Sequence, residues 1–336
     1  MELTTVADDH AVVHDGTVVR RHDGLEPETA YERDGFLFRT LPRPPGEHLA
    51  TFATVNDVHF GELECGIIDG LELGPTFRAE PGEDPYPEVM NRGAIEEIQA
   101  LDPAVVVVKG DLTADGTAEQ HDRFCSFYGE AFGERLVVTR GNHDVHLDED
   151  FAGAPTQLVE LPGALLAVLD TSVRHLAGGH LTVDQLEWLD DVVAGADRPV
   201  YVFGHHHVWS PDSATHEGAT FGIDPEASTA LVELVAARPA IRGYFAGHTH
   251  RNRVRHVSAT RDVPWVEVAC VKDYPGAWAE YRVHEGGLMQ VVHRISTPEA
   301  LRWTERTRHM FDGLYAEYAL GELGDRCFVV PAAARV

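Results

Sequence analysis

The stretch Ala104-Val105-Val106-Val107-Val108-Lys109-Gly110-Asp111 decides the fold of this chain. A run of apolar, mostly β-branched residues that ends at Gly-Asp indicates a buried strand of a parallel sheet. Such a strand places the carboxylate of Asp111 at the carboxyl edge of the sheet, where open α/β sheets collect their ligands. We therefore expect an α/β protein whose functional site is centred on Asp111.

Four further segments show the same pattern, in which an apolar strand stops at a turn bearing Asp, Asn or His. The carboxyl ends of neighbouring parallel strands share one edge of the sheet, so these polar side chains are expected to converge. Carboxylate, amide oxygen and imidazole groups all bind metals, and the pattern predicts a metal site assembled from five segments. The four turns are Asp57-Val58-His59, Gly141-Asn142-His143-Asp144, Gly204-His205-His206-His207 and Gly247-His248-Thr249-His250.

Taken in order, the five turns resemble the motifs of the calcineurin-like metallophosphoesterase superfamily, over about residues 50 to 275. The resemblance implies an α/β fold, a four-layer α/β/β/α sandwich of two mixed sheets flanked by helices. Within the superfamily, the motifs look most like those of bacterial class III cyclic-nucleotide and glycerophosphodiester phosphodiesterases. Purple acid phosphatases carry a tyrosine three residues after the shared aspartate. This chain has Ala114 there, which disfavours a tyrosinate-coloured phosphomonoesterase.

The resemblance also implies the ligands of two divalent metal ions. The first ion would take Asp57, His59, Asp111 and His250, and the second would take Asp111, Asn142, His205 and His248. Nitrogen and oxygen donors without a thiolate suit Mn, Fe, Zn or Co better than Ca or Mg. The choice of His205 depends on aligning Gly204-His205 with the family's Gly-His motif, and a shift by one residue would exchange it for its neighbour.

Three further residues are expected to serve the substrate. By resemblance, His143 stabilises the phosphoryl oxygens or protonates the leaving group, and Asp144 orients its ring. His206 is expected to contact the substrate or to support the metal ligands.

The function implied is hydrolysis of a small phosphodiester by a hydroxide that bridges two metals about 3.5–4 Å apart. A cyclic nucleotide such as 3′,5′-cyclic AMP is the first candidate substrate, and a glycerophosphodiester is the next. A phosphomonoesterase on the same site, a nuclease and a non-catalytic metal-binding scaffold are the alternatives. The chain has 55 acidic and 27 basic residues, a net charge of −28, so nucleic acid is disfavoured as a partner. Two divalent ions would create the local positive charge that an anionic substrate needs.

The chain is expected to divide into a β appendage at 1–45, a catalytic domain at 46–296 and a C-terminal helical extension at 297–336. The appendage resembles the β segment that precedes the catalytic domain in purple acid phosphatase relatives, and Asp15-Gly16 predicts a hairpin within it. Residues 61–88 are expected to form a lid or rim over the site. An apolar stripe in the extension would pack on the core or form a homodimer face; it comprises Trp303, Met310, Leu314 and Tyr318.

The four cysteines are scattered without Cys-x-x-Cys spacing, so we expect reduced core residues and no cysteine zinc site. The first residues lack the basic and apolar regions of a signal peptide. No apolar run approaches the roughly 18 residues of a membrane span. These features predict a cytoplasmic protein without a membrane partner.

Overall fold

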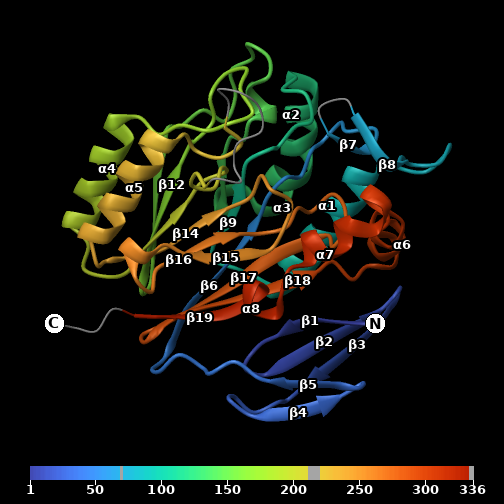
Figure 1. Cartoon of the computed structure of the whole chain (residues 1–336), viewed down its shortest axis with the longest axis horizontal. Helices are drawn as coiled ribbons and strands as arrows, with labels where there is room; N and C mark the ends of the chain where they lie inside the picture. The colour runs from blue at the N-terminus through green and yellow to red at the C-terminus, as the bar shows by residue number, and fades with distance from the viewer. Residues whose placement is uncertain (69–70, 211–219, 333–336) are drawn as a thin grey trace.

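The computed structural model describes residues 1–336 except 69–70, 211–219 and 333–336. Two six-stranded mixed sheets form its centre (Figure 1). In the first sheet three parallel strands are extended by three antiparallel ones. Its strands, in spatial order, are β10 (Leu136–Thr139), β9 (Val106–Lys109), β6 (His48–Val55), β17 (Ala277–His284), β18 (Gly287–Arg294) and β19 (Cys327–Pro331).

The second sheet has four parallel strands at its centre and an antiparallel strand at each edge. In spatial order these are β11 (Thr156–Leu161), β12 (Ala164–Leu169), β13 (Val200–Phe203), β14 (Ile241–Ala246), β16 (Pro264–Glu267) and β15 (Arg253–His256). Aromatic side chains fill the space between the two sheets. Phe52 stacks on Tyr281 at 4.6 Å, and Phe203 stacks on Phe245 at 5.0 Å between ring centres.

Helices cover the outer face of each sheet, which completes the predicted four-layer α/β/β/α sandwich (Figure 1). On the second sheet lie α4 (Val183–Ala194) and α5 (Pro225–Ala237). On the first sheet lie α1 (Tyr86–Leu101), α2 (Ala118–Phe124) with its continuation α3 (Glu130–Phe132), α6 (Pro298–Thr307) and α7 (Leu314–Leu320). Within the described part of the chain, no helix has the length and apolarity needed to cross a membrane.

Local caps begin the two helices on the second sheet. Thr182 and Gln185 form the capping box of α4, each side chain binding the other's backbone N–H. The Asp224 side chain accepts two backbone N–H groups at the start of α5, and Pro225 occupies its first turn.

The N-terminal residues form a small β layer against the first sheet. It contains β1 (Glu2–Val6), β2 (His10–Asp15), β3 (Val18–Asp23), β4 (Ala30–Arg33) and β5 (Phe36–Arg39). The expected hairpin lies between β2 and β3, where Asp15 pairs with Val18 across the turn. Ala7 packs on Met289, Val291 and Cys327, so this layer is joined to the catalytic sheet by a small apolar core.

Several elements differ from expectation. Residues 61–88 include a hairpin, β7 (Cys65–Ile68) and β8 (Leu71–Phe77), before α1 begins. Strand β16 runs parallel to β14 and antiparallel to β15. The segment 297–336 is not purely helical: after α8 (Leu323–Arg326) the chain adds β19 to the edge of the first sheet. The domain boundaries themselves stay a prediction.

The predicted apolar stripe divides between the core and the surface. Trp303 and Met310 are buried against the first sheet, while the exposed fractions of Leu314 and Tyr318 are 74% and 43%. The N-terminal half of the stripe therefore packs on the core. The homodimer stays a prediction.

Candidate metal centre

The turns singled out in the sequence meet where the two sheets adjoin. Asp57, Asp111 and Asn142 follow β6, β9 and β10 of the first sheet. His205 follows β13 of the second sheet, and His248 and His250 follow β14. Backbone hydrogen bonds within and between these turns hold them together. They include those from Asp57 N to Gly110 O (3.1 Å) and from Gly247 N to His205 O (2.9 Å).

The first expected ligand set is brought together. Asp57, His59, Asp111 and His250 offer ligand atoms that all lie within 4.8 Å of one another. His59 Nε2 is 3.4 Å from Asp111 Oδ2, and His250 Nε2 is 3.3 Å from Asp57 Oδ1. Both aspartates are buried and His250 is the most accessible of the four.

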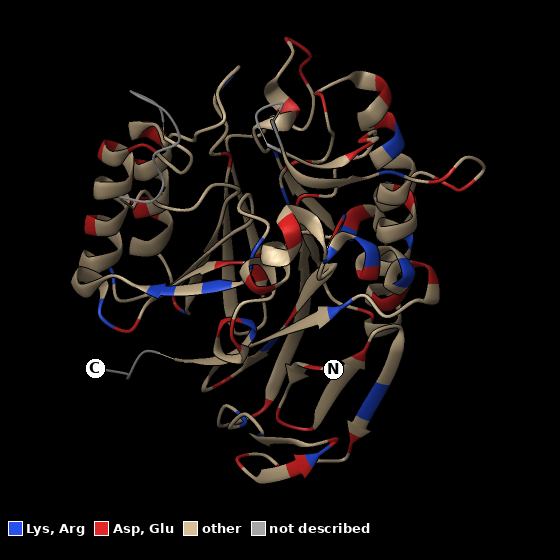
Figure 2. Ribbon diagram, turned by 45° about the vertical axis from the view of Figure 1, so that its right-hand side comes forward, with Lys and Arg blue, Asp and Glu red and all other residues tan. Residues whose placement is uncertain are grey.

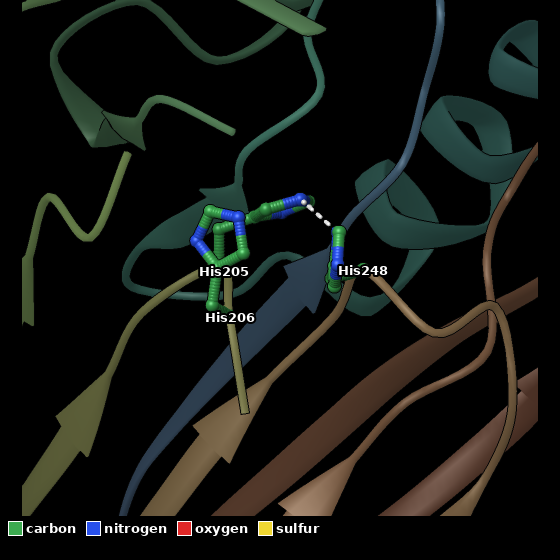
Figure 3. A group of neighbouring side chains, drawn as sticks. All are labelled: His205, His206 and His248. Carbon is green, nitrogen blue, oxygen red and sulfur yellow. Dashed lines mark hydrogen bonds between the residues drawn. The ribbon is translucent and has the colours of Figure 1, made fainter. Parts of the chain in front are cut away.

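The second expected set adjoins the first. His205 Nε2 lies 3.2 Å from Asn142 Oδ1 and 3.3 Å from Asp111 Oδ2. Figure 3 shows His248 directed at His205, with 3.2 Å between His248 Nδ1 and His205 Nε2. These distances favour the alignment that assigns His205, rather than its neighbour, to this position.

Backbone carbonyls fix the orientation of the two histidines. His205 Nδ1 donates to Lys109 O at 2.8 Å, and His248 Nε2 donates to Phe221 O at 2.6 Å. A carbonyl only accepts, so in the neutral ring the opposite nitrogen carries the lone pair. In both residues that nitrogen faces the centre, as a metal ligand requires.

The backbone is strained at the site in a consistent way. Five of the expected ligands adopt left-handed φ values, which are uncommon for residues other than glycine. The angles are 53° at Asp57, 46° at His59, 52° at Asp111, 68° at His248 and 55° at His250. This conformation turns both Asp57 and His59 toward the same edge, although they are only two residues apart.

Glycines precede the ligands because there is no room for a side chain. A Cβ atom on Gly110 would lie 2.5 Å from His205 Nδ1, and one on Gly247 would lie 2.7 Å from Asp57 Oδ2. A Cβ atom on Gly141 would collide with the Asp111 carboxylate. The Gly-Asp, Gly-Asn-His-Asp and Gly-His-x-His patterns therefore have a packing cause.

Buried opposite charges shift the pKa values in the centre. Burial alone would raise the pKa of Asp57 and of Asp111, but the His250 ring lowers the first and the His205 ring lowers the second. Burial alone would lower the pKa of His205, but the Asp111 charge, reinforced by Asp57, raises it to about 9. In the metal-free centre, protons on the histidines therefore balance the carboxylate charges. Metal cations could replace these protons.

The donor set fits divalent transition metal ions. It combines carboxylate, amide and imidazole groups, and among the expected ligands there is no thiolate. Neither ring nitrogen of the buried His59 has a hydrogen-bond partner, although Nε2 stands near Asp111. A buried polar atom without a partner is costly unless something else satisfies it, and a metal ion at this position would do so.

His143 is half-buried beside this centre, with its ring 4.6 Å from that of His59. Its Nδ1 donates to Ala114 O at 2.6 Å, so the ring is oriented by a carbonyl. The expectation that Asp144 orients His143 is wrong. Asp144 accepts from the backbone of Leu112, Thr113 and Gly141 at 2.8–3.1 Å. Burial and the Asp111 charge raise the pKa of Asp144 to about 6, and its role is to join the two ligand turns.

His206 is fully buried beside His205 and His248 (Figure 3). Its Nδ1 is hydrogen-bonded to Thr171 Oγ1 at 2.8 Å, while its Nε2 has no hydrogen-bond partner. This placement favours a role in supporting the histidines over direct contact with substrate.

Sequence reasoning missed Lys109. Its ammonium group has no exposed surface and donates to Ala246 O at 2.6 Å, which ties β9 of one sheet to β14 of the other. Burial lowers its pKa to about 7. The sequence did contain a signal for this residue, because Lys109 stands between a run of valines and the Gly110-Asp111 turn.

Known proteins resemble this chain in sequence and in fold. The family profile described as calcineurin-like phosphoesterase matches residues 50–252. A probable cyclic nucleotide phosphodiesterase of Synechococcus sp. is 24% identical over 58% of this chain and 78% of its own length. The 3′,5′-cyclic adenosine monophosphate phosphodiesterase CpdA of Pseudomonas aeruginosa is 25% identical over 68% of this chain and 81% of its own. Among solved structures, a dimetal phosphatase from Danio rerio has the same fold, with a TM-score of 0.56 and 15% identity, over 74% of this chain and 98% of its own.

Proposed function

Because the chain belongs to the calcineurin-like phosphoesterase family and is thus a metal-dependent phosphoric ester hydrolase, we propose that its substrate is a small phosphodiester. A 3′,5′-cyclic nucleotide is the first candidate, since relatives of this chain carry that activity in their names. A glycerophosphodiester is the next candidate.

The observation that carries the proposal is the position of Asp111 between two donor groups. Its Oδ2 atom is 3.4 Å from His59 Nε2 on one side and 3.3 Å from His205 Nε2 on the other. We assign Asp57, His59, Asp111 and His250 to one ion and Asp111, Asn142, His205 and His248 to a second. Two divalent transition metal ions supply Lewis acidity toward phosphate oxygens and a water molecule of lowered pKa.

Charge supports a small anionic substrate. With two divalent ions bound, the negative charges of Asp57 and Asp111 would not cancel the positive charges of the ions, so the centre would keep a local positive charge. The whole chain, by contrast, carries a net charge of −28. Figure 2 shows acidic residues on the helices of both outer layers and in the loops. A long polyanion would be repelled along that whole surface, whereas a single phosphodiester would meet only a small part of it.

We assign to His143 the role of acting on the leaving group. Its Nδ1 proton is engaged by Ala114 O, so Nε2 is the nitrogen available to the substrate. In the protonated ring Nε2 donates a hydrogen bond to a phosphoryl oxygen or a proton to the departing alkoxide. The His143 backbone N–H donates to Asp111 Oδ1 at 3.0 Å, which couples the position of this ring to that of the shared aspartate.

The test is turnover of three substrates after reconstitution with Mn²⁺. They are 3′,5′-cyclic AMP, bis(p-nitrophenyl) phosphate and p-nitrophenyl phosphate, with Asp111→Asn as the inactive control. We expect higher kcat/KM for the diesters than for the monoester. Preference for the monoester would overturn the proposal in favour of a phosphomonoesterase. Two bound metal ions without turnover of any of the three would point to a lid that admits only a specialised substrate.

A further inference from the structure

A buried polar cluster lies directly behind His250, on the side away from the metal centre. It consists of Cys270 and Asp273, which follow β16, and of Tyr315 from α7. His250 Nε2 faces Asp57 at 3.3 Å, so its Nδ1 faces the opposite way. On that side the ring nitrogen, the Cys270 sulfur and a carboxylate oxygen of Asp273 lie within 4.8 Å of one another.

His250 has two polar neighbours in this cluster. Its Nδ1 is 4.0 Å from Asp273 Oδ2, which is too long for a direct hydrogen bond. The Cys270 sulfur lies within 4.8 Å of a ring nitrogen of His250. The Cys270 thiol in turn donates to Asp273 Oδ1 at 2.8 Å.

Asp273 is held from the other side by two strong donors. Tyr315 Oη donates to its Oδ1 at 2.6 Å, and Lys272 Nζ donates to its Oδ2 at 3.0 Å. Lys272 also pairs with Glu62 at 2.8 Å. The carboxylate is therefore fixed, and it fixes the direction in which the Cys270 S–H bond points.

We propose that Cys270 is a positioning residue for His250. A histidine that binds a metal through Nε2 usually donates its Nδ1–H to a partner that fixes the ring and raises its basicity. Here the acceptor is the Cys270 sulfur, and Asp273 polarises that sulfur by accepting its proton in a hydrogen bond. This inference depends on the proposed assignment of His250 as a ligand.

The inference also gives the C-terminal segment a role in the centre. The family profile ends at residue 252, yet Tyr315 of α7 reaches Asp273 and Tyr318 donates to Thr249 O at 2.9 Å. Helix α7 therefore holds the turn that carries His248 and His250 as well as the partner of His250.

The test is calorimetric titration of the metal-free full chain with Mn²⁺, which measures the affinity of both binding steps. It is carried out on the wild type, Cys270→Ala and Cys270→Ser. Cys327→Ala is the matched control, since it removes a buried thiol beside β18, away from the centre. In the wild type and the control we expect two ions per chain. In Cys270→Ala we expect one of the two steps to weaken by about 10–100-fold. We expect Cys270→Ser to restore most of that loss, because a hydroxyl also accepts and donates.

Each outcome is decisive. Unchanged titration of Cys270→Ala, or equal losses in the alanine and serine variants, would overturn the positioning role. If Cys270→Ala does not fold, Tyr315→Phe replaces it in the test. This substitution removes only a hydroxyl group and should weaken the same binding step. If Tyr315→Phe binds both ions as tightly as the wild type, the inference is overturned. A wild-type chain that binds no metal would refute the proposed function itself, whereas two ions bound with wild-type affinity in every variant would refute only the role of Cys270.

Discussion

The Nε2 atom of His205 lies 3.3 Å from the Oδ2 atom of Asp111. These residues follow strands of different sheets, β13 and β9, so the centre exists only where the two sheets pack correctly on each other. The aromatic layer between the sheets therefore supports the chemistry as well as the fold. The hydrogen bond from Lys109 to Ala246 O fixes the same relationship near the ligands.

Substitution of Asp111 by asparagine is expected to abolish nearly all activity. The amide keeps the size of the side chain but removes the charge that balances two cations. We expect kcat to fall by more than about 100-fold, beyond the loss typical for outer partners of metal ligands, with fewer than two metal ions retained per chain. Metal analysis beside kinetics is the measurement, and wild-type turnover would refute the shared role of Asp111.

Substitution of His143 by alanine is expected to separate chemistry from metal binding. His143 lies beside the centre, hydrogen-bonded to Ala114 O, and is outside both expected ligand sets. We expect two bound ions, as in the wild type, but a kcat lower by about 100-fold or more, the usual effect of removing a general acid. Loss of metal from this variant would show that His143 acts as a ligand.

Substitution of Gly141 by alanine is expected to damage the site more than the fold. The added Cβ would collide with the Asp111 carboxylate, and relief of such a clash typically costs about 1–3 kcal/mol. We expect a modest fall in Tm and a large fall in metal affinity. Gly129→Ala is the control, because its Cβ would meet nothing closer than 4.0 Å outside its own helix. Equal metal affinity in the two variants would contradict the packing argument.

Metal affinity is expected to rise with pH. In the metal-free protein the Asp111 charge outweighs burial and holds the pKa of His205 at about 9, so His205 is protonated below that pH. A metal ion must then displace a proton. The apparent affinity should therefore increase by up to about tenfold per pH unit for this proton and level off above pH 9. Competition with a chelator between about pH 6.5 and pH 9 measures the slope, and an affinity that does not depend on pH would exclude this proton exchange.

The sequence predicted the sheets and the convergence of the ligand turns because that information is local. A buried strand, its closing turn and a ligand such as Asp111 or His205 lie within a few residues of one another. Parallel strands then bring the turns to one edge without any knowledge of long-range contacts. The glycines before Asp111, Asn142 and His248 marked positions where the turns approach closely.

The remainder depended on contacts between distant segments. Strand β15 is short and carries two arginines at a sheet edge, a composition that weakens the strand signal. Strand β19 lies beyond the helices in the sequence. Its residues do not show that it pairs with β18. Asp144 binds three backbone N–H groups rather than His143, and α7 reaches Asp273 and Thr249 from a distant part of the chain. No spacing in the sequence encodes these contacts.

The most direct test of a centre that uses two ions is stepwise reconstitution. Metal-free protein is titrated with Mn²⁺ while hydrolysis of bis(p-nitrophenyl) phosphate is followed. We predict that activity reaches its full value only at two ions per chain, and that Asp111→Asn stays inactive throughout. Full activity at one ion per chain, or turnover without metal, would contradict the account.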